Sequence, residues 1–98
     1  MREHGERQAE VWLNAGLKAG GLKEADLMGL KGSDPRKLLL ADLLWRRAVV
    51  SQEWLAEKLE MKAAANVSQK LRRLDGKAAL KKIPDELKHF LAKINAPN

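Results

Sequence analysis

The chain has 98 residues, no cysteine and a formal net charge of +6, with 45% hydrophobic and 33% charged residues. This length is typical of one domain with a single core, and the lack of cysteine excludes a disulfide framework and a thiolate zinc site. The polar start predicts no signal peptide and no apolar run is long enough to span a bilayer, so we expect a cytoplasmic protein with no membrane partner.

The pattern of apolar residues predicts helices almost throughout the chain, because alternation of apolar and polar residues is scarce. The first helix is expected over residues 3–19, and Gly20-Gly21 ends it because glycine adopts the left-handed conformation at a helix C-terminus. A short helix follows at about 23–30. The apolar positions that should pack these two helices are Ala9, Val11, Trp12, Leu13, Ala15, Leu17, Leu27, Met28 and Leu30.

A third helix is expected from Pro35 to about Ala48. Asp34 can accept hydrogen bonds from the free backbone N–H groups of its first turn, and Pro35 suits the first helical position. This helix is apolar on most of its faces, which is typical of a helix buried in the centre of a domain. Its apolar residues are Leu38, Leu39, Leu40, Ala41, Leu43, Leu44 and Trp45.

Residues 51–74 are predicted to form two short helices around a tight connection, the layout of a helix-turn-helix. Ser51 should cap the first of these helices through its hydroxyl group. Glu60-Met61-Lys62 forms the connection, and the second helix begins near residues 63–65. It runs to about Leu74 and carries Val67, Leu71 and Leu74 on one face.

Asp75-Gly76 is expected to end that helix. The lysine-rich stretch from Lys77 to Lys82 is then interpreted as a basic linker, and Pro84 begins a last helix that runs to about residue 94. We therefore predict one all-α domain over residues 1–98, a compact bundle of five or six helices. Its helix-turn-helix lies at about 51–74 and its basic linker and last helix at 77–95.

Three tryptophans occupy apolar helical stripes, which favours core packing over stacking on bases. They are Trp12, Trp45 and Trp54.

The second helix of the pair carries side chains that recognise nucleic acids. Asn and Gln amides can bond adenine edges, Arg can bond guanine edges, and any basic residue can bind phosphate. Residues 61–82 contain seven basic residues and one acid, which is typical of a surface for a polyanion. We therefore expect binding to double-stranded DNA through Lys62, Asn66, Gln69, Lys70, Arg72, Arg73, Lys77, Lys81 and Lys82.

The spacing within this motif departs from the commonest helix-turn-helix pattern. If Ala56 is the small residue of the first helix, the usual turn glycine falls at Glu60, and Val67 comes about one residue late. We therefore expect a slightly longer connection between the two helices.

Residues 31–74 resemble the C-terminal region of the REP-associated and related tyrosine transposases of the HUH class, and a weaker likeness extends back to residue 2. The residues that carry the resemblance are Lys31-Gly32, Asp34-Pro35-Arg36-Lys37, Trp54-Leu55-Ala56, Leu59 and Met61. The family often has a threonine pair where this chain has Ala48-Val49, and glycine where it has Lys62.

The resemblance implies a DNA-binding helix-turn-helix without the enzyme. The family's catalytic domain uses a His-x-His metal pair and a tyrosine nucleophile, and this chain has no tyrosine and has only the separated His4 and His89. We expect no catalytic activity, no cofactor and no metal site. Two alternatives stay open: a protein-interaction or dimerisation module built on the leucine-rich helix, with a homodimer as one form of it, and a structured-RNA binder that uses the same basic face.

Overall fold

The computed structural model describes residues 2–95, which form six α-helices and one 3-10 helix and contain no strand. The all-α prediction is confirmed. None of the helices in these residues is both long and apolar enough to cross a membrane. In chain order the elements are α1 (Arg2–Ala19), η1 (Glu24–Met28), α2 (Pro35–Arg47), α3 (Gln52–Lys58), α4 (Ala64–Arg73), α5 (Gly76–Leu80) and α6 (Asp85–Asn95).

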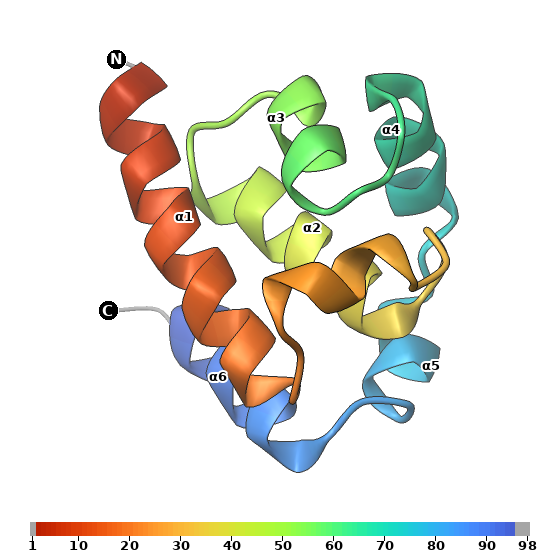
Figure 1. Ribbon diagram of the computed structural model, residues 1–98. Coiled ribbons are helices and arrows are strands. Elements are labelled where there is room, and N and C mark those ends of the chain that lie inside the picture. Colours follow the sequence, from red (N-terminus) through yellow and green to blue (C-terminus); the bar gives the residue numbers. More distant parts are fainter. Residues whose placement is uncertain (1, 96–98) are drawn as a thin grey trace.

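The helix α2 is the centre of the bundle. It packs against α1, α3, α4, α5 and α6, with α3 and α4 at one end of the molecule and α5 and α6 at the other (Figure 1). Leu40, Leu43 and Leu44 are almost completely buried, as the apolar pattern predicted. The prediction was wrong for Trp45, which is 43% exposed because Leu43 and Leu44 already fill the inward positions of the last turn.

The predicted end of α1 and the predicted starts of α2 and α3 are confirmed, and each is fixed by hydrogen bonds between residues close in sequence. Gly21 has φ +71, and the N–H of Leu22 donates to the Leu17 carbonyl at 2.8 Å, which closes the C-terminus of α1. Asp34 accepts a hydrogen bond from the N–H of Arg36 at 2.9 Å, and the Ser51 hydroxyl accepts one from the N–H of Trp54 at 3.0 Å. Each cap joins groups within five residues, so the sequence alone was sufficient to predict it.

The basic linker was interpreted wrongly, because it contains the short helix α5. The helix α4 already ends at Arg73, and Asp75 begins α5 instead of ending α4, since its carboxylate accepts a hydrogen bond from the N–H of Ala78 at 3.3 Å. Ala79 and Ile83 are buried, and α5 packs against α2. This packing returns the chain toward the core before α6 begins.

Three expected packing positions also face outward. Met28 is 77% exposed because η1 has three residues per turn, so Leu27 takes the inward position and Met28 the outward one. Val11 is 58% exposed and Ala15 is exposed as well, because α1 packs through Ala9 and Leu13 at a spacing of four residues. Of the remaining tryptophans, Trp12 and Trp54 are partly buried against the core.

Among the residues that the structure describes, one charged side chain lies in the buried core, that of Lys37, which the sequence indicated only as part of the run Asp34–Lys37 and not as a core residue. Its side chain is completely buried, and Nζ donates to the carbonyl oxygens of Leu30 at 3.1 Å and Glu60 at 3.2 Å. Burial lowers the pKa of Lys37 from its ordinary value of 10.5, while the charges of Glu60 and Asp34 act in the opposite direction. The ammonium therefore joins the loop before α2 to the turn between α3 and α4.

Lys37→Ala should lower the free energy of unfolding by about 2–5 kcal/mol, because it removes a buried side chain and leaves two carbonyl oxygens without their donor. Urea titration followed by circular dichroism measures the change. The control is Lys93→Ala on the exposed surface of α6, for which we expect a change within about 0.5 kcal/mol. Equal stabilities of the two variants would contradict the structural role of Lys37.

A second prediction concerns Asp34, whose carboxylate pairs with the Arg36 guanidinium at 3.2 Å. Burial tends to raise the pKa of Asp34, but the hydrogen bonds and charge of Arg36 outweigh it and hold the pKa below its ordinary value of 3.8. The lowered pKa means that Asp34 stabilises the fold above pH 3.8 and loses this effect as pH falls through the folded-state value.

Asp34→Asn keeps a capping oxygen but has no titrating group. Urea titrations between about pH 2 and 6 should therefore show that the wild type loses up to about 1 kcal/mol more stability on acidification than this variant. The other carboxylates titrate in both proteins, so the difference between the two curves isolates Asp34. Parallel curves would contradict the lowered pKa.

Candidate nucleic-acid interface

The helices α3 and α4 are joined by five residues, 59–63, which is longer than the usual turn of a helix-turn-helix and agrees with the longer connection expected from the sequence. At the end of α3 the N–H of Met61 donates to the Ala56 carbonyl at 2.8 Å. Glu60 lies between them with φ +54, the left-handed conformation for which glycine is usually needed. The position at which the motif usually has glycine therefore does adopt the glycine conformation.

Lys62 adopts a second left-handed conformation two residues later, with φ +74. The N–H of Ala63 donates to the Met61 carbonyl at 2.9 Å, so Lys62 is the central residue of a γ-turn of the rare, positive-φ type. The same carbonyl accepts a hydrogen bond from the Asn66 side-chain amide at 3.1 Å, and the Met61 side chain is buried. The turn is therefore held by the hydrogen bonds to the Met61 carbonyl and by the burial of the Met61 side chain.

The two faces of α4 have the polarity that the sequence predicted. Val67 is fully buried, and Leu71 and Leu74 pack partly buried against the core. Gln69, Arg72 and Arg73 are exposed. No acidic residue occurs anywhere in this helix, so its exposed face offers one amide and two guanidinium groups to a ligand.

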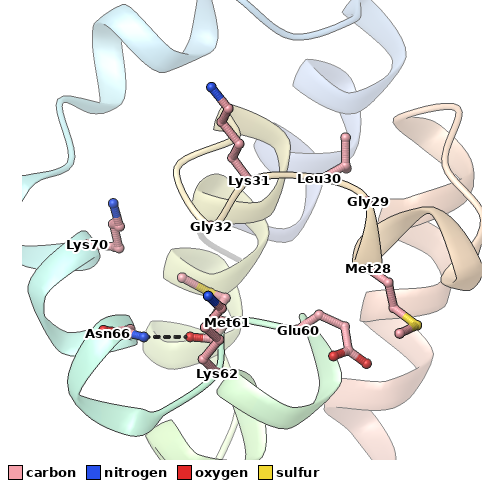
Figure 2. Close-up of a pocket in the computed structure, with 10 residues that line it drawn as sticks. All are labelled: Met28, Gly29, Leu30, Lys31, Gly32, Glu60, Met61, Lys62, Asn66 and Lys70. Carbon is pink, nitrogen blue, oxygen red and sulfur yellow. Dashed lines mark hydrogen bonds between the residues drawn. The ribbon is translucent and has the colours of Figure 1, made fainter.

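Asn66 differs from its neighbours on α4. Its side chain is only partly exposed, and Nδ2 is used in the hydrogen bond to the Met61 carbonyl (Figure 2). An amide that already holds the turn has one fewer donor for a base edge. We therefore assign Asn66 a positioning role in the turn rather than a free recognition role.

A groove of about 500 Å³ separates this turn from the loop before α2. We name it the turn groove. Lys31 lines it from the loop, Lys62 from the turn and Lys70 from α4, and Figure 2 shows Lys31 and Lys70 extending in the same direction on its two sides. One acidic residue, Glu60, also lines the groove, so its charged side chains sum to a positive charge.

A second groove, of about 290 Å³, lies between α4 and α5, and we name it the α5 groove. Lys70 lines this groove as well as the turn groove, and it is joined there by Arg73 and Lys82. Asp75 is the acidic residue in its lining. The packing of α5 against α2 brings Lys82 into the same groove as Arg73, although the two residues are nine positions apart in the sequence.

The remaining predicted site residues do not line these grooves. Lys77 and Lys81 are exposed on α5 and at its end, but neither contributes to the turn groove or the α5 groove. Lys31 was not among the predicted site residues, although Lys31-Gly32 was among the residues that carry the resemblance. The sequence shows a lysine beside a glycine, which is typical of an exposed loop. The neighbouring residues do not predict that this loop lies opposite Lys62.

In the part of the chain that the structure describes, the basic residues of the turn groove have no acidic partner, unlike several other basic residues. Arg46 pairs with Asp42 at 2.9 Å and Lys58 with Glu10 at 3.6 Å. Within residues 2–95 no carboxylate is paired with Lys31, Lys62 or Lys70. A positive surface without internal counter-charges is suited to an external anion.

Candidate metal ligands do not gather in the same way. Over the described part of the chain, no group of three or more His, Cys, Asp or Glu side chains lies close enough together to hold a metal ion.

Comparison of the chain with protein-family models, with curated proteins and with solved structures finds no match.

Proposed function

We propose that this protein binds double-stranded DNA, with α3 and α4 acting as a helix-turn-helix and α4 inserted into the major groove. The observation that carries the proposal is the group of basic side chains on α4 and in the two grooves beside it, which share Lys70. The exposed face of α4 carries Gln69, Arg72 and Arg73, and the lysines that line the two grooves have no acidic partner among the described residues. Such a surface combines groups for base edges with charges for the phosphates on either side.

The side chains divide into two roles within this proposal. Gln69 lies on the exposed face of α4, where its amide can bond an adenine edge, and Arg72 can bond a guanine edge. Lys70 and Arg73 on α4, Lys62 in the turn before it and Lys82 in the α5 groove are suited to phosphates. Lys77 and Lys81 add positive charge on α5 and at its end. The small residues Ala64 and Ala65 begin α4 and allow its N-terminus to approach the bases closely.

The conformation of the turn supports the likeness to transposase tails. Those tails often have glycine at the position of Lys62, and φ +74 is a conformation that glycine adopts without steric cost. We therefore propose a transposase-associated or regulatory DNA-binding module, without catalytic activity, which is cytoplasmic and nucleoid-associated when bound to DNA.

The two alternative functions fit the same structure differently. The leucines of α2 are buried in this chain's own core, so they are not available to a partner, and a dimerisation module would need another surface. A structured RNA could use the same basic surface as DNA. Competition between an unlabelled structured RNA and a labelled duplex distinguishes these two ligands.

Binding to a labelled DNA duplex should weaken as salt rises. If about five phosphates are neutralised by Lys62, Lys70, Arg73 and their neighbours, the slope of log affinity against log salt should be roughly −4 to −5. Fluorescence anisotropy over a series of potassium chloride concentrations measures this slope. The proposal fails if the protein binds no duplex at low salt.

Gln69→Ala should reduce sequence preference rather than general affinity. The preferred duplex is first obtained by selection from random sequences. The variant should then lose about 1–3 kcal/mol on that duplex and little on a scrambled one, because a base-edge bond is lost. The matched control is Gln8→Ala on the exposed surface of α1, which should bind both duplexes as the wild type does. Equal weakening on both duplexes would show that Gln69 does not read bases.

Lys82→Ala should reduce the general affinity for DNA rather than the sequence preference. Lys82 lines the α5 groove and is assigned to phosphate, so its loss should weaken both duplexes similarly and reduce the salt slope by about 1. Lys93→Ala, on the exposed surface of α6, removes the same charge away from α4 and serves as the control. A loss of affinity confined to the preferred duplex would indicate that Lys82 contacts bases rather than phosphates.

A further inference from the structure

The turn between α3 and α4 contains an unusual concentration of strained backbone. Within residues 2–95, Glu60 and Lys62 are the non-glycine residues with positive φ, at +54 and +74. This conformation is sterically unfavourable for any residue with a Cβ atom. Glu60 is needed to end α3, but the exposed side chain of Lys62 forms no hydrogen bond or ion pair with any residue that the structure describes. Glycine would form the same turn without strain, so folding does not explain a lysine here.

The strained residue lies in the wall of the turn groove. Lys31 lines the groove from the opposite loop and Lys70 lines it from α4 (Figure 2). Both loops are held by the same buried ammonium, since Lys37 donates to the Leu30 carbonyl beside Lys31 and to the Glu60 carbonyl two residues before Lys62. The backbone segments that carry the two lysines are therefore held in place before any ligand binds.

The chemistry of the turn groove fits a chain of phosphates. Lysine ammonium groups bind phosphate oxygens as point charges, and three of them line the groove against one carboxylate, that of Glu60. The apolar lining includes Leu30, which is partly exposed, and Met28, which is 77% exposed, and these side chains give the deoxyribose rings of a backbone an apolar contact. A single free anion would not need so extended a surface.

We propose that the turn groove seats the sugar–phosphate backbone of one DNA strand, with Lys31 and Lys62 on phosphates from its two walls and Lys70 at its α4 end. This inference rests on the proposed function and adds to it a residue outside the helix-turn-helix, Lys31. It also gives the strained conformation of Lys62 a role, which is to hold an ammonium group where glycine would leave none. The strained backbone of Lys62 lowers the stability of the fold, but its ammonium group contributes to binding.

The test compares Lys62→Gly, Lys62→Arg and Lys31→Ala with the wild type and with Lys93→Ala. Lys62→Gly should raise the melting temperature by about 4 °C, because it relieves the positive φ, and should weaken duplex binding roughly five-fold. Its salt slope should fall by about 1. Lys62→Arg keeps both the strain and the charge, and should retain the melting temperature and the affinity of the wild type.

Lys31→Ala should weaken binding to the same extent as Lys62→Gly, with the melting temperature unchanged. A rise in melting temperature together with a loss of affinity in Lys62→Gly supports the inference, since a merely structural turn residue would not produce both. If the wild type binds duplex DNA but Lys62→Gly and Lys31→Ala bind it as Lys93→Ala does, this inference is overturned and the proposed function stands. If the wild type binds no duplex, both are overturned.

Discussion

The ammonium group of Lys37 determines how the two loops on either side of the turn groove are arranged. A charge buried without partners is very unfavourable, so the fold must supply hydrogen-bond acceptors to this nitrogen. It supplies them from the carbonyl oxygens of Leu30 and Glu60, which are separated by thirty positions in the chain. Since both carbonyls belong to loops, the constraint fixes segments that apolar packing alone would leave free.

This arrangement gives the surface around α4 its shape. The helix is anchored by Val67 on its inner side, and its outer side is continued by the loop of Lys31 in one direction and by the end of α5 in the other. The charged residues of the candidate interface therefore come from three segments that are distant in sequence. They form one surface because the loop before α2 and α5 are both held against the central helix and its neighbours.

The turn between α3 and α4 illustrates the difference between a conformation that the fold requires and one that it tolerates. Glu60 is left-handed because α3 must end sharply enough for Met61 to reach the core, where its side chain is buried. Lys62 is left-handed because the Met61 carbonyl accepts hydrogen bonds from both Ala63 and Asn66, which closes the γ-turn around it. The surrounding hydrogen bonds compensate for this strain, so the conformation persists in a residue that does not favour it.

The sequence by itself determined the features that depend on neighbouring residues. The caps at Asp34, Gly21 and Ser51 join groups a few positions apart, and the spacing of Val67, Leu71 and Leu74 is enough to separate the two faces of α4. The central position of α2 was also predictable, because a helix that is apolar on most faces needs neighbours on most sides.

Only the tertiary structure decided which distant residues meet. The burial of Lys37, the return of Lys82 beside α4 and the approach of Lys31 to Lys62 each depend on contacts between separate segments. The outward position of Trp45 has the same origin, since Leu43 and Leu44 fill the inward positions of its helix. Local periodicity indicates that a side chain is apolar, but the space available in the packed core determines whether it is buried.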